Sequence, residues 1–237
     1  MANVQHCPVC GSPLADDDRF CPNCGAQFGP AYLSSSELAR IEPPSDVALW
    51  PSSDPLLELE IDYPERLSRW KIFVKWLFAI PHFFVLSFFN LLVSIFVFIA
   101  WFVILVTKRY PESLYELVLT YMRWTANVNA YVMLQRDEYP PFGERPYPVR
   151  LDLPYPAELS RWLIFIKWLL VIPSIIVYAF VAIVLLFALF IAWWVILITG
   201  NMPRALFDFI TGVNRWGYRI NAYTWLMTDK YPPFSLE

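Results

Sequence analysis

The feature that most constrains this chain is an apolar run of about 37 residues that occurs twice. The first copy extends from Trp70 to Val106 and the second from Trp162 to Ile198, at a constant offset of 92 residues (162 − 70). The flanking landmarks keep this offset: Leu-Ser-Arg-Trp at 67–70 and 159–162, Asn-Ala-Tyr at 129–131 and 221–223, and Tyr-Pro-Pro-Phe at 139–142 and 231–234. A repeat this regular indicates one structural module present twice.

Composition places this module in a membrane. The chain is 57% hydrophobic and 18% aromatic, with a mean hydropathy of +0.43, which exceeds the usual apolar share of a soluble domain. The net charge of −3 leaves no basic surface of the kind that binds nucleic acid, so no nucleic-acid partner is expected. Residues 1–6 lack the basic and apolar regions of a signal peptide, so we expect a cytosolic N-terminus.

The length of the apolar runs favours a transmembrane hairpin in each repeat. One helix of this length would measure ~55 Å, nearly twice the ~30 Å hydrocarbon thickness of a bilayer, whereas two arms of ~27 Å fit it. We expect the bends near 87–94 and 179–184, with Pro81 and Pro173 kinking the first arms. The alternative is an interfacial helix up to the proline followed by one crossing, for example 174–198.

Basic residues flank both ends of both runs, which supports the hairpin because lysine and arginine mark the cytoplasmic side of a membrane. They are Arg66, Arg69, Lys71, Lys75, Lys108 and Arg109 around the first run, and Arg161, Lys167 and Arg204 around the second. Lys75 and Lys167 lie one to two turns inside the runs, where we expect them to snorkel to the interface. The functional alternative is a contact with a lipid phosphate. His82, which Ser174 replaces in the second repeat, is interpreted as a packed or interfacial residue and not as a proton relay.

Alternating residues predict short strands around the runs. Residues 57–63 and 149–153 alternate at period two, and 130–135 and 222–227 are candidate strands that end at the Tyr-Pro-Pro-Phe turns. These four segments predict one small cytoplasmic sheet.

A third helix is expected after each run, at 111–129 and 203–221, opened by a proline. Polar residues recur along one side of each, which predicts an amphipathic helix in the interface plane. We interpret the arginines of these helices and the repeated acidic residues mainly as charge pairs that order the cap, with anionic lipid headgroups as the alternative. The arginines are Arg123, Arg215 and Arg219, and the acidic residues are Glu116, Asp208, Asp137 and Asp229.

Residues 1–28 contain two Cys-Pro-x-Cys-Gly knuckles, formed by Cys7, Cys10, Cys21 and Cys24. Two such turns complete a tetrahedral site, so the four cysteines predict a structural Zn²⁺ ion. Two disulfides are disfavoured because nothing indicates export, and iron or a redox role is less expected. A site closed by four ligands leaves no position for a substrate, which argues against metal catalysis.

The predicted architecture is therefore a polytopic α-helical membrane protein with a small cytoplasmic β-sheet and an N-terminal zinc ribbon. The domains are a zinc ribbon at 1–28, a flexible linker at 29–55, membrane repeat 1 at 56–145 and membrane repeat 2 at 146–237. Serine, proline and acidic residues define the linker.

Several spaced elements resemble a known family. They are Arg-Leu-Ser-Arg-Trp at 66–70, Lys-Trp-Leu with a following Ile-Pro, Thr-Lys-Arg-Tyr-Pro at 107–111, Arg-Trp with Asn-Ala-Tyr, and Asp-x-Tyr-Pro-Pro-Phe. This pattern resembles the bacterial membrane family called domain of unknown function 4389, present as two tandem copies over about 56–237. The first 28 residues resemble the short zinc ribbon of many prokaryotic membrane proteins. The resemblance implies a prokaryotic plasma-membrane protein and transfers no catalytic residues.

The functional expectation is a non-enzymatic membrane scaffold or accessory subunit that forms a homo-oligomer or joins a larger complex, with the ribbon docking a cytosolic partner. The alternative is an oligomeric lipid or solute conduit with polar groups from Lys75, Lys167, His82 and Asn90. An enzyme is the least expected class, because the sequence shows no nucleophile with a base, paired carboxylates or open metal site.

Overall fold

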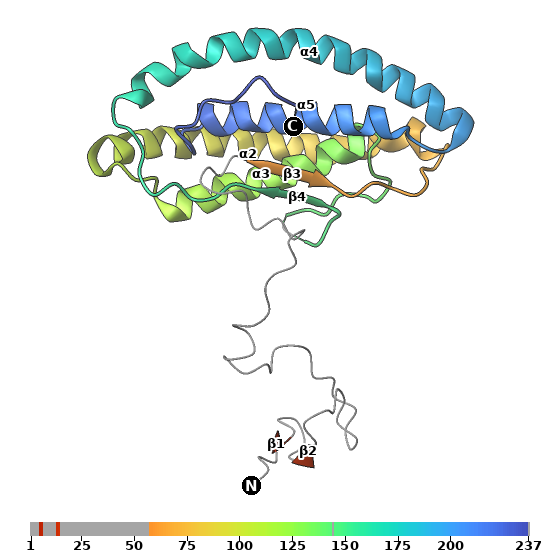
Figure 1. Cartoon of the computed structure of the whole chain (residues 1–237), viewed down its shortest axis with the longest axis horizontal. Helices are drawn as coiled ribbons and strands as arrows, with labels where there is room; N and C mark the ends of the chain where they lie inside the picture. Colours follow the sequence, from red (N-terminus) through yellow and green to blue (C-terminus); the bar gives the residue numbers. More distant parts are fainter. Residues whose placement is uncertain (1–4, 7–12, 15–56, 144, 237) are drawn as a thin grey trace, which may run out of the picture. The chain divides into compact units, whose positions relative to one another are not determined.

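The computed structural model describes residues 5–6, 13–14, 57–143 and 145–236 (Figure 1). The chain divides into two compact units, Met1–Asp54 and Pro55–Glu237. In the first unit, strand β1 (Gln5–His6) pairs antiparallel with β2 (Pro13–Leu14). All four cysteines and the predicted linker at 29–55 lie outside the described residues.

The second unit repeats one order of elements: a short strand, a long helix and a shorter helix. The first repeat contains β3 (Glu58–Ile61), α2 (Lys71–Thr107) and α3 (Glu112–Val132). The second contains β4 (Val149–Asp152), α4 (Leu163–Thr199) and α5 (Arg204–Thr224). Both long helices are long and apolar enough to cross a membrane, as the sequence predicts.

The predicted hairpins are wrong, because each apolar run forms one continuous helix of 37 residues. The expected bends at 87–94 and 179–184 are helical throughout, and Pro81 and Pro173 lie inside helices that continue past them. The alternative division at the proline is therefore not observed either. Figure 1 shows α4 as a bow that arches over the straight α5. We call the two long helices, α2 and its equivalent α4, the bows.

Helix length explains the bow. A helix of 37 residues measures about 55 Å, whereas its partner of 21 residues measures about 31 Å. Antiparallel packing ties both ends of the long helix to its shorter partner, so the excess length arches away from it. A proline in the interior removes one backbone hydrogen bond, which eases this curvature.

Only a narrow seam of each bow contacts the rest of the protein. The buried residues of α2 are spaced by three, four or seven positions, and they are Ile72, Lys75, Ala79, His82, Leu86, Val93, Ala100 and Ile104. The equivalent seam of α4 includes Ile164, Lys167, Val171, Ser174, Leu185, Ala192 and Ile196. Such spacing is that of one helix packing along another, and it leaves the remaining apolar faces exposed.

The sheet contains two strands among the described residues. Leu59 lies opposite Leu151 in the antiparallel pair of β3 with β4, and both side chains are buried while their neighbours are exposed, as the alternation predicts. The predicted strands at 130–135 and 222–227 are wrong. Helices α3 and α5 extend into these segments and end in turns, in which Leu134 and Leu226 have positive φ values of 64° and 63°.

Backbone hydrogen bonds join the two repeats at the ends of the bows. The Leu67 amide donates to the Gly200 carbonyl at 2.8 Å, and the equivalent Leu159 amide donates to the Lys108 carbonyl at 2.8 Å. Thus the segment before each bow binds the end of the other. The repeats form one interlocked unit with internal pseudo-two-fold symmetry.

Candidate functional site

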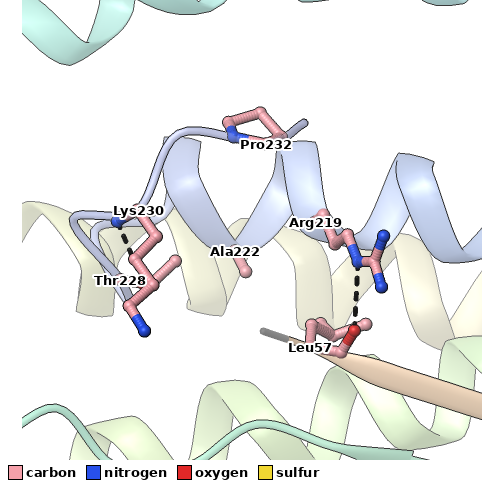
Figure 2. Close-up of a pocket in the computed structure, with 6 residues that line it drawn as sticks. All are labelled: Leu57, Arg219, Ala222, Thr228, Lys230 and Pro232. Carbon is pink, nitrogen blue, oxygen red and sulfur yellow. Dashed lines mark hydrogen bonds between the residues drawn. The ribbon is translucent and has the colours of Figure 1, made fainter. Parts of the chain in front are cut away.

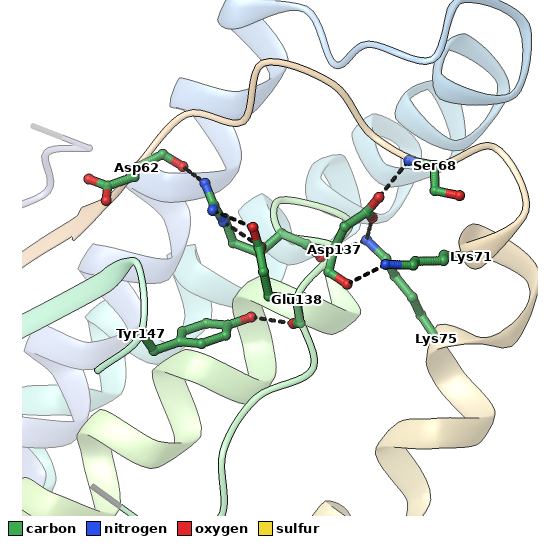
Figure 3. A network of polar contacts seen from close by, with 8 residues as sticks. Asp62, Ser68, Lys71, Lys75, Asp137, Glu138 and Tyr147 are labelled. Carbon is green, nitrogen blue, oxygen red and sulfur yellow. Dashed lines mark hydrogen bonds and ion pairs between the residues drawn. The ribbon is translucent and has the colours of Figure 1, made fainter. Parts of the chain in front are cut away.

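A buried ion pair fastens the start of each bow. In the first repeat, Lys75 Nζ lies 2.8 Å from Asp137 Oδ1, donates to the Arg136 carbonyl at 2.7 Å and lies 5.4 Å from the centre of the Tyr131 ring. The Ser68 amide donates to the other carboxylate oxygen of Asp137 at 2.5 Å (Figure 3). We call this arrangement the first latch.

The second repeat builds the same latch from equivalent residues. Lys167 Nζ lies 2.7 Å from Asp229 Oδ1 and donates to the Thr228 carbonyl at 2.8 Å, while the Ser160 amide donates to Asp229 Oδ2 at 2.5 Å. The Tyr223 ring centre lies 5.1 Å from the amine. Each latch joins three segments: the loop before the bow, the bow itself and the turn after the short helix.

Burial changes the interpretation of both lysines. Lys75 is 1% exposed and Lys167 is 2% exposed, so the prediction that they snorkel to the interface is wrong. Protein groups occupy both amines, which leaves no geometry for the alternative lipid-phosphate contact. A charge can be buried in this way only when a partner and hydrogen bonds replace its water.

A polar network surrounds the first latch. Arg136 binds the Glu138 carboxylate through Nε at 3.0 Å and Nη2 at 2.8 Å, and its Nη1 donates to the Asp62 carbonyl at 2.8 Å. The Tyr147 hydroxyl donates to the Glu138 carbonyl at 2.8 Å (Figure 3). The second repeat has Thr228 and Lys230 at the equivalents of Arg136 and Glu138, so it cannot form this carboxylate pair. The network connects the end of β3 to the segment before β4.

The predicted arginines bind the two-stranded sheet. Arg123 of α3 donates to the Leu151 carbonyl at 3.0 Å and pairs with Asp152 at 2.8 Å. The equivalent Arg215 of α5 donates to the Leu59 carbonyl at 3.1 Å through Nε and 2.9 Å through Nη2. The predicted charge pairing is therefore observed at Arg123, with a β4 carboxylate as the partner.

Arg219 continues this pattern one turn later. Its Nε donates to the Leu57 carbonyl at 3.1 Å, beside a cavity of about 10 Å³ that Lys230 also lines (Figure 2). This volume admits about one water molecule, so the cavity does not fit a lipid headgroup. Arg215 and Arg219 of α5 thus both donate to main-chain carbonyls of the β3 segment.

A tyrosine holds the segment that leaves β4. The Tyr115 hydroxyl of α3 donates to the carbonyls of Leu153 and Pro154, both at 3.0 Å. Burial raises the pKa of the Tyr115 phenol, so the hydroxyl stays protonated and remains a donor.

His82 is packed within the protein, as predicted. The Trp124 indole donates to His82 Nδ1 at 3.3 Å, and the Phe142 ring stacks on the imidazole at 4.0 Å between centroids. At the equivalent place in the second repeat, the Ser174 and Tyr231 hydroxyls are 2.7 Å apart. The repeats thus fill one packing position in two ways.

Two larger cavities lie along the bows. One of about 410 Å³ is bounded by the second half of α2, the first turns of α4 and the end of α5. Another of about 300 Å³ lies between α3, α4 and α5, and its lining includes Asn129, Asn214 and Asn221. Among the described residues, no group of three or more His, Cys, Asp or Glu side chains is arranged to hold a metal ion.

Sequence reasoning placed Asp137 and Asp229 in charge pairs of the cap but missed the buried lysines as their partners. Asp137 and Asp229 recur at the same offset as Lys75 and Lys167, so the repeat contained the signal needed to match them. The carbonyl acceptors on β3 and β4 had no such signal, because backbone groups are the same in every residue.

The fold and its latches define a duplicated helical protein, in which each repeat fastens one long apolar bow to a layer of two shorter helices and a two-stranded sheet. The chain belongs to the family described as "Domain of unknown function (DUF4389)", which matches residues 69–143 and 161–235 in tandem. Residues 6–28 match a zinc-ribbon domain. No curated protein and no solved structure matches the chain.

Proposed function

We propose that this protein is a non-enzymatic membrane scaffold whose two bows lie in one leaflet of the bilayer, while its ribbon docks a cytosolic partner. The observation that carries the proposal is the exposed apolar surface of both bows. Large apolar side chains there are exposed over most of the helix length, for example Phe84, Phe98, Phe180 and Phe187. A surface of this size and continuity requires a lipid or protein cover.

The position of the polar layer supports an in-plane arrangement over a crossing. Near one end of α2, Lys75 contacts Tyr131 of α3, and near the other end Ile104 and Tyr115 of α3 belong to one buried cluster. The polar helix therefore runs beside most of the bow. A crossing of the bilayer by α2 would carry the charged residues of α3 through the hydrocarbon, which costs several kcal/mol for each ion.

Insertion of two bows into one leaflet offers a scaffolding mechanism. Helices that bury one face at the boundary of headgroups and acyl chains expand that leaflet, and their binding depends on curvature and lipid composition. The internal pseudo-symmetry supports association into a homo-oligomer or larger complex. Prokaryotic plasma membrane is the proposed location, with the polar layer and N-terminus on the cytoplasmic side.

The contacts of the polar residues favour a scaffold over a conduit. A conduit would use Lys75, Lys167 and His82 as lining groups, but all three are buried among protein partners. Asn90 lies on the exposed side of α2, where its side-chain oxygen is 3.5 Å from the Tyr121 hydroxyl. These positions do not converge on one pore.

Topology can be tested with introduced cysteines at two pairs of equivalent exposed positions. Glu65→Cys and Ala157→Cys precede the two bows, whereas Arg109→Cys and Asn201→Cys follow them. In full-length protein in sealed vesicles, we expect a membrane-impermeant maleimide to label all four positions from the same side. Peptide mass spectrometry separates these sites from the ribbon cysteines. Because the start of each bow binds the end of the other, crossing helices would place Glu65→Cys with Asn201→Cys on one side and Ala157→Cys with Arg109→Cys on the other. Labelling in that pattern would overturn the proposal.

The ribbon is proposed to hold one structural Zn²⁺ ion through Cys7, Cys10, Cys21 and Cys24. Strands β1 and β2 pair on either side of the segment with the first two cysteines, which fits a hairpin knuckle. The metal would supply most of the stability of so small a unit, since its few residues cannot build a core.

Metal analysis of the purified full-length chain tests this assignment. We expect about one zinc per chain, and Cys10→Ser or Cys21→Ser should remove most of it because a structural site needs all four ligands. Elemental mass spectrometry gives the zinc content. Retention of a full zinc complement in both variants would contradict the assignment. Fractionation of the same variants with membranes should stay unchanged, since the bows belong to the other compact unit.

A further inference from the structure

From the cavity of about 410 Å³, we propose that the protein binds one acyl chain of an anionic phospholipid in a groove between α2 and α4. This inference rests on the proposed membrane location. The groove is lined by Val97, Phe98 and Trp101 of α2, by Ile164 and Trp168 of α4, and by Leu226 after α5. Its volume lies within the range of about 300–1,000 Å³ typical of small-molecule sites.

The lining and the surroundings of the groove point to a lipid. Phe98 and Trp168 are exposed on the apolar faces of the bows, so the groove is continuous with the surface that meets the bilayer. An acyl chain can therefore enter sideways from the leaflet. The amine of Lys167, which also lines the groove, is neutralised by Asp229 at 2.7 Å and adds no free charge to it.

Cations gather where the end of α2 meets the start of α4. The Arg161 guanidinium donates to the Val106 carbonyl at 2.6 Å, which places it beside the exposed Lys108 and Arg109. Ile164, in the groove, follows Arg161 by three residues, at the start of α4. A lipid whose chain fills the groove can thus place its phosphate among three cations.

The other seam between the bows provides an internal comparison. There Leu186 and Val132 replace two groove residues, Ser94 and Thr224. Because these side chains are larger or more apolar, we expect them to fill the equivalent space. Gly200 and Asn201 stand where the first seam has Lys108 and Arg109. Residue size and charge thus distinguish this seam from the other, so the proposal places the lipid at this seam.

The test uses full-length protein in phosphatidylcholine vesicles that contain a small fraction of phosphatidylglycerol with a diazirine on its acyl chain. After irradiation, peptide mass spectrometry maps the labelled residues. We expect enriched labelling at Val97, Trp101 and Trp168 over exposed mid-bow positions. The double variant Ser94→Leu/Thr224→Val, which copies the other seam, should lower groove labelling about tenfold.

A matched control separates filling of the groove from a general effect on α2. Ser87→Leu introduces the same side chain on an exposed face outside the groove, and both serines make the same hydrogen bond to the carbonyl four residues earlier, at 2.7 Å for Ser87 and 2.9 Å for Ser94. This control should keep the labelling of the original protein. An equal loss in both variants would overturn the proposal.

A separate variant tests the contribution of the cations to the binding of an anionic lipid. Lys108→Gly/Arg109→Asn copies the second seam, and glycine suits the left-handed backbone of Lys108, where φ is 60°. We expect the preference for labelled phosphatidylglycerol over equally labelled phosphatidylcholine to fall about tenfold.

The outcomes distinguish this inference from the proposed function. Uniform labelling along both bows, unchanged by filling the groove, would show ordinary surrounding lipid and overturn the site while leaving the membrane location intact. Absence of labelling anywhere on the bows would overturn both.

Discussion

Lys75→Met is expected to destabilise the protein by about 3–5 kcal/mol, the typical cost of removing one partner of a buried ion pair. Asp137 would stay largely enclosed with its charge uncompensated, and the Arg136 carbonyl would lose a donor at 2.7 Å. For a chain of this size, the melting temperature should fall by about 10 °C. Thermal unfolding followed by tryptophan fluorescence in a mild detergent gives the shift.

Two further variants separate the ion pair from other effects of the substitution. Lys71→Met removes an exposed amine that donates to the Asp137 carbonyl at 3.3 Å, and it should change stability by less than about 0.5 kcal/mol. Lys75→Met/Asp137→Asn removes both charges and keeps an acceptor for the Ser68 amide, so it should regain more than half of the loss. If Lys75→Met were as stable as the original protein, the ion pair of the first latch would not stabilise the start of α2.

The second latch allows an independent check of the same argument. Lys167→Met leaves Asp229 without its partner at 2.7 Å, so its effect should resemble that of Lys75→Met. The network of Arg136 and Glu138 exists only beside the first latch. A consistently larger loss at Lys75 would measure the coupling of that network to the ion pair.

The sequence repeat predicted the bounds of the two apolar runs, although not that each run is a single helix. The apolar runs were predicted from residue 70 to 106 and from 162 to 198, and the helices occupy Lys71–Thr107 and Leu163–Thr199. Alternation also located β3 and β4. Hydropathy and the spacing of apolar residues show which side chains avoid water. The positions of these helices and strands depend mainly on the burial of those side chains.

The hairpin error shows what hydropathy leaves out. A run longer than the bilayer thickness can fold back, tilt or curve, and composition alone does not distinguish these outcomes. Here the decisive contacts are the latch at one end of the bow and the tight turn into α3 or α5 at the other. The acceptors in these contacts include main-chain carbonyls of Arg136 and Lys108, which residue types do not mark.

The misassigned strands at 130–135 and 222–227 have a local cause. Their tyrosine, valine and methionine residues suit a strand as well as a helix, so propensity does not decide. In the fold, Trp124 and Val128 belong to one buried cluster with Leu86 of α2, which extends the helix. The left-handed residues Leu134 and Leu226 then end the turns, with their side chains buried.

Phe88→Asp/Phe180→Asp is expected to release the protein from membranes. The two phenylalanines are equivalent, lie close to the midpoints of the bows and are 59% and 66% exposed. If the bows are embedded, each aspartate costs roughly 2.5–3.5 kcal/mol at the centre of an inserted helix. Together the two changes should lower the preference for the membrane by about 10⁴-fold, since 1.4 kcal/mol corresponds to a factor of ten.

Density flotation of membranes after alkaline extraction measures this effect, with Val106→Asp/Ile198→Asp as the matched control. Val106 and Ile198 are also equivalent and exposed, but they lie in the last turns of the bows, beside the polar layer. Charges near the interface cost about 0–1 kcal/mol each, so the control should float with the membranes like the original protein. Flotation of the mid-bow variant to the same extent would contradict an embedded apolar face. Loss of flotation in both variants would instead place the ends of the bows as deep as their centres, which is incompatible with a polar layer that holds both ends at the surface.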